Sequence, residues 1–222
     1  MRFILGDVET TGVRPTDTVC EVAYREIDLD FNTIREGSSL INPGQPIPPG
    51  ASAVNGITDS MVIGAPTLDE FMAAHGDPFN VPEAVFVAHN AAFDLRYLGP
   101  YLPADALSLC TLACARRLYP NADNHKQGTL AYMLELPIDR STAHSAEGDL
   151  DVLTYLIKRM CQDADCDLPG LLEVQSRRLA ITKMPFGKHK GDPLDSLRPN
   201  YVSWLLSLDN LDPDLRHALE NL

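Results

Sequence analysis

Residues 2–12 read RFILGDVETTG, and this stretch decides the fold because it predicts a buried strand that ends in two acids. Alternate residues of a strand share a face, so Asp7 and Glu9 continue the apolar row that Phe3 and Leu5 begin. Two carboxylates this close repel each other unless a positive group lies between them. The stretch alone leaves two alternatives open, which are a solvated turn between glycines and a charged site.

Strands dominate the first third of the chain, and helices alternate with strands after it. The apolar pattern predicts strands over 2–8, 18–30 and 34–42, and a further strand that begins near 83. Pro and Gly are dense over 43–62, which predicts a loop that enters a short helix. Helical patterns cover 68–76, 111–120, 128–136 and 145–161. This order of elements predicts an α/β domain with a mixed sheet.

The character of the sequence changes near 165–180. The chain of 222 residues has room for one ordinary domain and a small appendage. We therefore expect a main domain over 1–165, a linker over 166–180 and a small C-terminal domain over 181–222.

Charge is distributed unevenly along the chain. The formal net charge is −13, yet residues 1–174 hold 11 Lys and Arg against 25 Asp and Glu, while 175–222 hold 7 against 6. Residues 177–190, RRLAITKMPFGKHK, contain five basic residues and no acid. The total charge therefore does not exclude a phosphate-rich partner, because body carboxylates that hold cations would not repel it.

Cysteine usage and the N-terminus bear on localisation. The five cysteines form no C-x-x-C pair, which favours reduced thiols in a cytoplasmic protein. The first apolar run is too short for a signal peptide, and no run approaches the length of a membrane span. We expect a cytoplasmic protein that does not enter a membrane.

Two further acids fall at inward-facing element ends. On the helix predicted over 145–161, Asp149 lies within the apolar stripe, whereas Asp151 lies on the solvent side. Asp94 repeats this placement where a helix starts after FVAHNAAF. The positive end of a helix dipole is the alternative explanation for an acid in this position.

Four inward carboxylates together indicate a cation. Oxygen-rich sites of this kind suit Mg²⁺ or Mn²⁺, and two such ions are the usual arrangement for displacement at a phosphodiester. His144 lies five residues before Asp149, which makes it a candidate general base near neutral pH.

The motifs that carry these residues resemble one known family. DVETTG, HNAAFD and HSAEGD, in that order, resemble the three motifs of the DnaQ-like exonucleases and together match their DEDDh signature. VNGIT (54–58) resembles the segment between the first two motifs. The resemblance implies a ribonuclease-H-like fold, with a five-stranded mixed sheet flanked by helices.

The resemblance also implies roles for particular residues. Two Mg²⁺ ions, for which Mn²⁺ would substitute, would be held by four acids, and a histidine would activate water. The terminal nucleotide would be contacted by residues of the three motifs. The residues implied are Asp7, Glu9, Asp94 and Asp149 for the metals, His144 for the water, and Thr10, Thr11, Val54, Asn90 and Phe93 for the substrate.

The tail resembles the C-terminal extension of the bacterial exonuclease X branch of this family, through FGKHKG and the segment that follows it. Two alternatives stay open for FGKHKG, which are a hairpin turn with solvated lysines and a phosphate-binding surface. In the second, Arg177, Arg178, Lys188 and Lys190 contact phosphates. We expect Trp204 to lie in the core of the small domain.

The resemblance implies a 3′→5′ exonuclease that releases nucleoside monophosphates and serves DNA repair or replication. DNA 3′ ends are the expected substrate, with an exoribonuclease or a polymerase-associated proofreading enzyme as alternatives. A non-catalytic nucleic-acid scaffold would be expected to have lost some of the metal-binding acids, and this sequence has them all. The sequence leaves the oligomeric state open, with a homodimer among the options.

Overall fold

The computed structural model describes residues 1–138, 145–208 and 211–222. Within it the chain divides into two compact units, Met1–Gln175 and Ser176–Leu222. Each unit has its own buried core and is described by itself.

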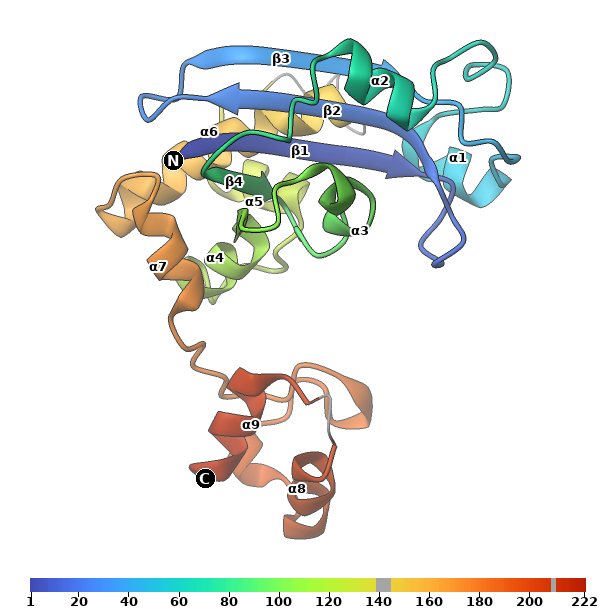
Figure 1. The fold of residues 1–222 in the computed structure, drawn as a ribbon. Helices are drawn as coiled ribbons and strands as arrows, with labels where there is room; N and C mark the ends of the chain where they lie inside the picture. The colour runs from blue at the N-terminus through green and yellow to red at the C-terminus, as the bar shows by residue number, and fades with distance from the viewer. Residues whose placement is uncertain (139–144, 209–210) are drawn as a thin grey trace. The chain divides into compact units, whose positions relative to one another are not determined.

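The first unit is built on one five-stranded sheet (Figure 1). Its strand order is β3-β2-β1-β4-β5, in which β1, β2 and β3 pair antiparallel and β4 and β5 run parallel to β1. The bounds are Arg2–Thr10 for β1, Val19–Ile27 for β2, Thr33–Leu40 for β3, Ala84–Ala88 for β4 and Leu107–Cys110 for β5. The expected mixed sheet of five strands is therefore confirmed, although the residue pattern alone had not located β5.

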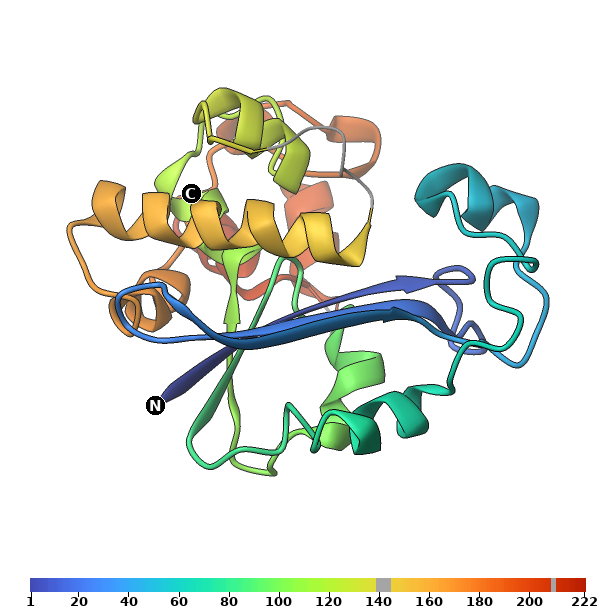
Figure 2. The same cartoon turned by 90° about the horizontal axis from the view of Figure 1, so that it is seen from above.

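Helices cover both faces of this sheet. Figure 2 views the sheet from its edge, with the long helix α6 on one side and α2 and α3 on the other. The helices of the first unit are α1 (Pro49–Asn55), α2 (Leu68–Ala74), α3 (Leu95–Leu98), α4 (Thr111–Leu118), α5 (Gln127–Met133), α6 (Ala146–Ala164) and α7 (Gly170–Ser176), with a 3₁₀ turn, η1, at Gly99–Tyr101.

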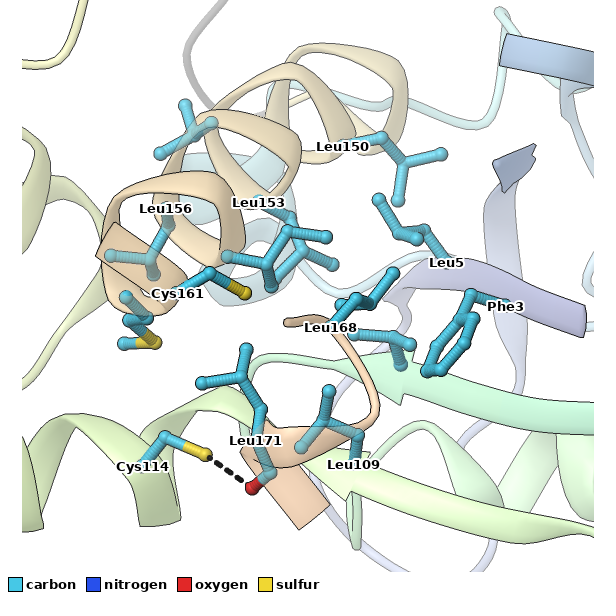
Figure 3. Close-up of a cluster of buried hydrophobic side chains, with 14 of the residues drawn as sticks. Phe3, Leu5, Leu109, Cys114, Leu150, Leu153, Leu156, Cys161, Leu168 and Leu171 are labelled. Carbon is cyan, nitrogen blue, oxygen red and sulfur yellow. Dashed lines mark hydrogen bonds between the residues drawn. The ribbon is translucent and has the colours of Figure 1, made fainter. Parts of the chain in front are cut away.

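Strand alternation divides the core between the two faces. Phe3 and Leu5 of β1 point toward α6 and pack against leucines such as Leu150 and Leu153 (Figure 3). Ile4 and Val8 alternate with these residues along β1 and belong to the core on the opposite face. Asp7 and Glu9 thus share the face that α6 covers, as the period of two predicts.

Two contacts fix the start of α6. Ser145 caps the helix, because its Oγ accepts a hydrogen bond from the Gly148 backbone N–H at 3.1 Å. Two residues beyond Asp149, Asp151 forms an ion pair with Arg25 of β2, with Oδ1 and Nη2 2.8 Å apart. Arg25 therefore ties α6 to the sheet close to the acidic residues.

Residues 166–180, expected to form a linker, include helix α7. Leu168, Leu171 and Val174 are buried in the core of the first unit, against β5 and α4. Figure 3 shows the Cys114 thiol donating to the Leu171 carbonyl oxygen at 3.5 Å. In the described part of the chain, no helix is long and apolar enough to cross a membrane.

The second unit is small and helical. It contains the 3₁₀ turns η3 (Gly187–His189) and η4 (Leu194–Ser196) and the helices α8 (Pro199–Leu206) and α9 (Pro213–Glu220). Its core is formed by Met184 and six leucines, which include Leu205 and Leu215. Trp204 is 52% exposed, so the expectation that it lies in this core is wrong. Leu205, the next residue of α8, fills the core instead.

Candidate active site

Three carboxylates from two elements meet beside the end of β1. Asp7 and Glu9 come from the strand and Asp149 from the first turns of α6, and one oxygen of each lies within 4.8 Å of the others. The strand period places the first two on the face toward α6, and the capped start of α6 brings the third to them. The sequence prediction that these residues gather is therefore consistent with the geometry.

Asp94 approaches this cluster from the end of β4. It is the N-cap residue of α3 and is only 3% exposed. The turn that places it passes through Asn90, whose φ of 70° lies in the left-handed region that asparagine tolerates. The backbone N–H of Val8 in β1 stabilises the ionised form of Asp94. The fourth acid therefore lies beside β1, although it is not within 4.8 Å of all three others.

Burial and mutual repulsion disfavour the ionised forms of these acids. The pKa of Asp7 is raised well above its ordinary value, first by burial and then by the charges of Asp94, Asp149 and Glu9. Burial is also the main reason that the pKa of Glu9 rises to about 7 and that of Asp94 to about 7. In the described part of the chain, no lysine or arginine pairs with Asp7, Glu9 or Asp94.

Glu21 is a fifth carboxylate that the sequence reasoning missed. It lies directly opposite Glu9 in the pairing of β1 with β2, and burial raises its pKa. Its Oε2 accepts a hydrogen bond from the backbone N–H of Ala146, the first residue of α6, at 3.0 Å. No motif marks this residue, because an alternating polar position in a strand is common. Only the register of β1 on β2 brings it to the site.

Asn55 lies in the VNGIT segment, but the sequence reasoning gave it no role. It is buried at the end of α1, and its Nδ2 donates to the Thr10 carbonyl oxygen at 3.2 Å. Its side chain also hydrogen-bonds Glu9, which lowers the pKa of that carboxyl and so opposes the effect of burial. Asn55 therefore connects α1 to the end of β1 that carries the acids.

Thr10 and Thr11 are buried and have partners inside the protein. The Thr10 hydroxyl donates to the Gly12 carbonyl oxygen at 2.7 Å. The Thr11 Oγ1 accepts from the Thr18 backbone N–H and from Gln45 Nε2, each at 3.0 Å. These bonds hold the loop between β1 and β2, so any contact of the two threonines with a nucleotide would have to share these groups.

The other residues that the motifs implied for the substrate lie on α1 and in the turn after β4. Val54 is 67% exposed on α1, and Asn90 is exposed at the turn after β4. Phe93 is half-buried, and its ring lies 4.8 Å from the guanidinium carbon of Arg96. His144 falls outside the described residues, immediately before Ser145, which caps α6.

The four basic residues proposed for phosphate contacts all belong to the second unit and are exposed. They are Arg177, Arg178, Lys188 and Lys190.

The donor set fits a hard divalent cation. Oxygens on opposite sides of an octahedral Mg²⁺ are about 4.2 Å apart, because each Mg–O bond is about 2.1 Å. Neighbouring oxygens on the same ion are about 3.0 Å apart, so three carboxylate oxygens within 4.8 Å of one another lie close to the range that one ion needs. A cation would also remove the repulsion that raises the pKa values of these acids.

Known proteins are similar to this chain in sequence and in fold. Residues 4–157 match the family model RNase_T, described as exonuclease. Exodeoxyribonuclease 10 of Escherichia coli K12 is 28% identical over 97% of each chain. DNA polymerase III of the PolC type from Bacillus cereus is 30% identical over 72% of this chain and 11% of the polymerase. The structure of exonuclease X in complex with 5′-overhanging duplex DNA matches with a TM-score of 0.64 and 25% identity, over 78% of this chain and 99% of that one.

The family model spans β1 to α6 and therefore contains all four acids of the site. The match to exodeoxyribonuclease 10 extends beyond that region, over nearly the whole chain. The chain belongs to the exonuclease family and is a 3′→5′ exonuclease of the DnaQ-like type.

Proposed function

We propose that this chain hydrolyses the terminal phosphodiester bond at DNA 3′ ends and releases nucleoside monophosphates, with two Mg²⁺ ions at its acidic site. The observation that carries the proposal is the group of three carboxylate oxygens within 4.8 Å, contributed by Asp7, Glu9 and Asp149. Asp94, buried beside them, would complete the set of ligands.

The number of acids supports two ions rather than one. Four carboxylates carry twice the charge of one divalent ion, and Glu21 adds a fifth acid to the same region. Asp7 would be the ligand shared by both ions. The charges of Asp94, Asp149 and Glu9 all act on its carboxylate and raise its pKa, so it lies among the other acids. When bound, the ions supply positive charge to the attacking and the leaving oxygens. Mn²⁺ would substitute for Mg²⁺, since both accept oxygen ligands.

The chain itself would supply the proton acceptor. His144 precedes the cap of α6 by one residue, and Asp149 follows on the same helix. We assign His144 as the group that takes a proton from the attacking water. Its ordinary pKa suits this role near neutral pH.

DNA is the proposed substrate because of the extent of the similarity. The match to exodeoxyribonuclease 10 covers 97% of this chain and includes the second unit, whereas the match to the polymerase covers 72%. We therefore place the chain with free-standing enzymes that act on DNA ends rather than with proofreading domains. Val54, Asn90 and Phe93 are the proposed contacts to the terminal nucleotide.

Matched DNA and RNA oligomers of one sequence, labelled at the 5′ end, test this function. With Mg²⁺ we expect a ladder of DNA products that shorten from the 3′ end and little change in the RNA. Faster shortening of the RNA would replace DNA by RNA as the substrate. Asp7→Asn is the control for contaminating nucleases, and undiminished turnover by this variant would overturn the metal assignment.

A further inference from the structure

The second unit contains a pocket that the proposed chemistry does not use. Its volume is about 520 Å³, within the range of roughly 300–1,000 Å³ that small-molecule sites occupy. We call it the aromatic–basic pocket, and its lining residues are Lys188, His189, Arg198, Asn200, Tyr201 and Trp204.

On the aromatic side of the pocket, three rings pack against one another. The rings of Tyr201 and Trp204 have centroids 5.4 Å apart and planes inclined by 30°. His189 packs on Tyr201 with ring centroids 4.6 Å apart, and its Nδ1 is hydrogen-bonded to Asp192 at 2.9 Å. Trp204 nevertheless stays 52% exposed. A large aromatic side chain that is fixed on one side and open on the other is suited to stacking.

The FGKHKG segment (186–191) holds the basic side of the pocket in place. Gly187 and Gly191 have φ values of 71° and 90°, which most residues with a side chain avoid. The Lys190 backbone N–H donates to the Gly187 carbonyl oxygen at 3.1 Å and closes the turn. Lys188 is thereby placed with its Nζ 5.2 Å from the centre of the Tyr201 ring. The segment is therefore an ordered turn that also lines a pocket.

The charges of the pocket indicate an anionic ligand. In the described part of the chain, neither Lys188 nor Arg198 forms an ion pair, although the chain has 31 acids for 18 Lys and Arg. Asp192 is the acid nearest to Lys188 in sequence, and it is bonded to His189. Two cations that form no ion pair with the described residues, beside an open indole, match the combination by which proteins bind single strands, with phosphates on cations and bases on aromatic rings.

We propose that the aromatic–basic pocket binds an unpaired stretch of DNA, with a base stacked on Trp204 and phosphates at Lys188 and Arg198. Duplex DNA fits less well, because its bases are already stacked on one another and cannot cover the indole. The pocket would keep a strand attached to the protein while the acidic site acts, since a tethered ligand has a high local concentration. The choice of DNA as the ligand rests on the proposed function, but binding of DNA to the pocket does not require a metal ion at the acidic site.

Trp204 is the chain's only tryptophan, so its emission reports on this pocket alone. The full-length protein is titrated with oligothymidylate in the presence of EDTA, which prevents hydrolysis. We expect saturable quenching of the emission by the single strand and much weaker quenching by a blunt hairpin of equal charge. The absence of quenching, or equal quenching by the hairpin, would overturn the proposal. Polyglutamate that competes as well as DNA would overturn it too, because the pocket would then bind acidic polymers.

Variants read by anisotropy of a labelled oligothymidylate complete the test. Trp204→Ala should weaken binding on the order of tenfold or more, whereas Trp204→Phe should retain most of the affinity. Lys188→Ala and Arg198→Ala should each reduce the salt slope by about 0.7, the value for one phosphate on a single strand. Lys183→Ala is the matched control, because Lys183 is exposed in the same unit and does not line the pocket. An equal effect of Lys183→Ala would show diffuse charge attraction and refute the pocket.

Hydrolysis of a dinucleotide separates this proposal from the proposed function. The one phosphate of a dinucleotide is the one that is cleaved, so it cannot also lie at Lys188 and Arg198, and Trp204→Ala should cleave this substrate at the wild-type rate. Asp7→Asn should fail to cleave it and still quench with oligothymidylate. Loss of quenching in a protein that cleaves the dinucleotide would refute the pocket alone.

Discussion

Glu21 of β2 lies directly opposite Glu9 of β1, and its Oε2 accepts the backbone N–H of Ala146 at 3.0 Å. One carboxylate thus borders the acidic cluster and also holds the first residue of the helix that carries Asp149. Without the Glu21 carboxylate, the backbone N–H of Ala146 would lose this hydrogen bond. Ala146 is buried, and an unpaired buried N–H is costly. Glu21 is therefore placed to position Asp149 rather than to act on the substrate.

Substitutions at Glu21 separate its hydrogen bond from its charge. Glu21→Gln keeps an oxygen acceptor for the Ala146 N–H, whereas Glu21→Ala removes it. An unpaired buried group costs about 1–3 kcal/mol, so we expect Glu21→Ala to lower kcat by about tenfold and Glu21→Gln to retain most of it. Steady-state kinetics on a DNA oligomer at several Mg²⁺ concentrations would measure this. Equal losses in both variants would assign the effect to the charge instead.

The pKa shifts predict how stability depends on pH when no metal is bound. The pKa values of Glu9 and Asp94 rise from 4.5 and 3.8 to about 7 in the folded protein. The folded chain therefore binds more protons than the unfolded chain between these values, and the free energy of unfolding falls as pH rises through this window. We expect a higher melting temperature in EDTA near pH 5 than near pH 8.

Asp7→Asn is the matched variant for that experiment. It removes one of the repelling charges, so it should raise the melting temperature in EDTA at pH 8 while abolishing hydrolysis. Mg²⁺ should stabilise the wild type at pH 8 much more than the variant, because binding to the folded state shifts the equilibrium. A metal-free wild type that gains stability between pH 5 and pH 8 would contradict the electrostatic account.

Gly6 provides a test of packing beneath the site. A Cβ at this position would lie 2.5 Å from Cε2 of Phe86, so Gly6→Ala overpacks the face of β1 that is opposite the acids. Overpacking of this kind costs about 1–3 kcal/mol, and the shift of β1 should also reduce kcat by moving Asp7. Urea unfolding would measure the cost, and Phe86→Leu in the same chain should recover part of it. Gly128→Ala is the control, because nothing lies within 4 Å of a Cβ there and we expect no loss.

His144→Ala tests the proposed general base. Loss of such a group lowers the rate by about 10²–10⁴, and added imidazole should restore part of the activity. The acidic limb of the pH–rate profile should also change, because the histidine must be neutral to accept a proton. His217→Ala, at an exposed position on α9, should leave both the rate and the profile unaltered. A wild-type rate for His144→Ala near neutral pH would remove this residue from the mechanism.

The parts of this protein that the sequence predicts are those governed by local patterns. Strand period and helical periodicity indicate which way Asp7 and Asp149 face, and the order of elements predicts the mixed sheet. Glu21 escapes such reasoning because cross-strand register brings it to the site, and the role of Asn55 depends on how α1 lies against the end of β1. Strand β5 has only four residues and too short a pattern to detect.

Trp204 was expected in the core of the second unit and lies at its surface. A single tryptophan among leucines reads as core, since apolar periodicity does not distinguish the buried side of a short helix from an aromatic side that faces solvent. In α8 the buried position belongs to Leu205, and Trp204 packs against Tyr201 at the surface.

The position of α7 leads to a prediction about where the chain can be cut. Leu168, Leu171 and Val174 are buried in the core of the first unit, although the sequence pattern ends the main domain at 165. Burial of one such side chain stabilises a protein by roughly 1.5–3 kcal/mol, so a chain that stops at Asp165 loses several kcal/mol. A chain that stops at Ser176 keeps all three.

We therefore expect the 1–176 chain to unfold cooperatively, near the temperature at which the first unit unfolds within the 222-residue chain. It should also cleave a dinucleotide at the wild-type rate. The 1–165 chain should melt at a much lower temperature or aggregate, because Leu109 and Cys114 would lose the apolar side chains that cover them. Calorimetry and dinucleotide hydrolysis on both chains measure this difference. Equal stability of the two would place the boundary at 165 and make α7 part of the linker.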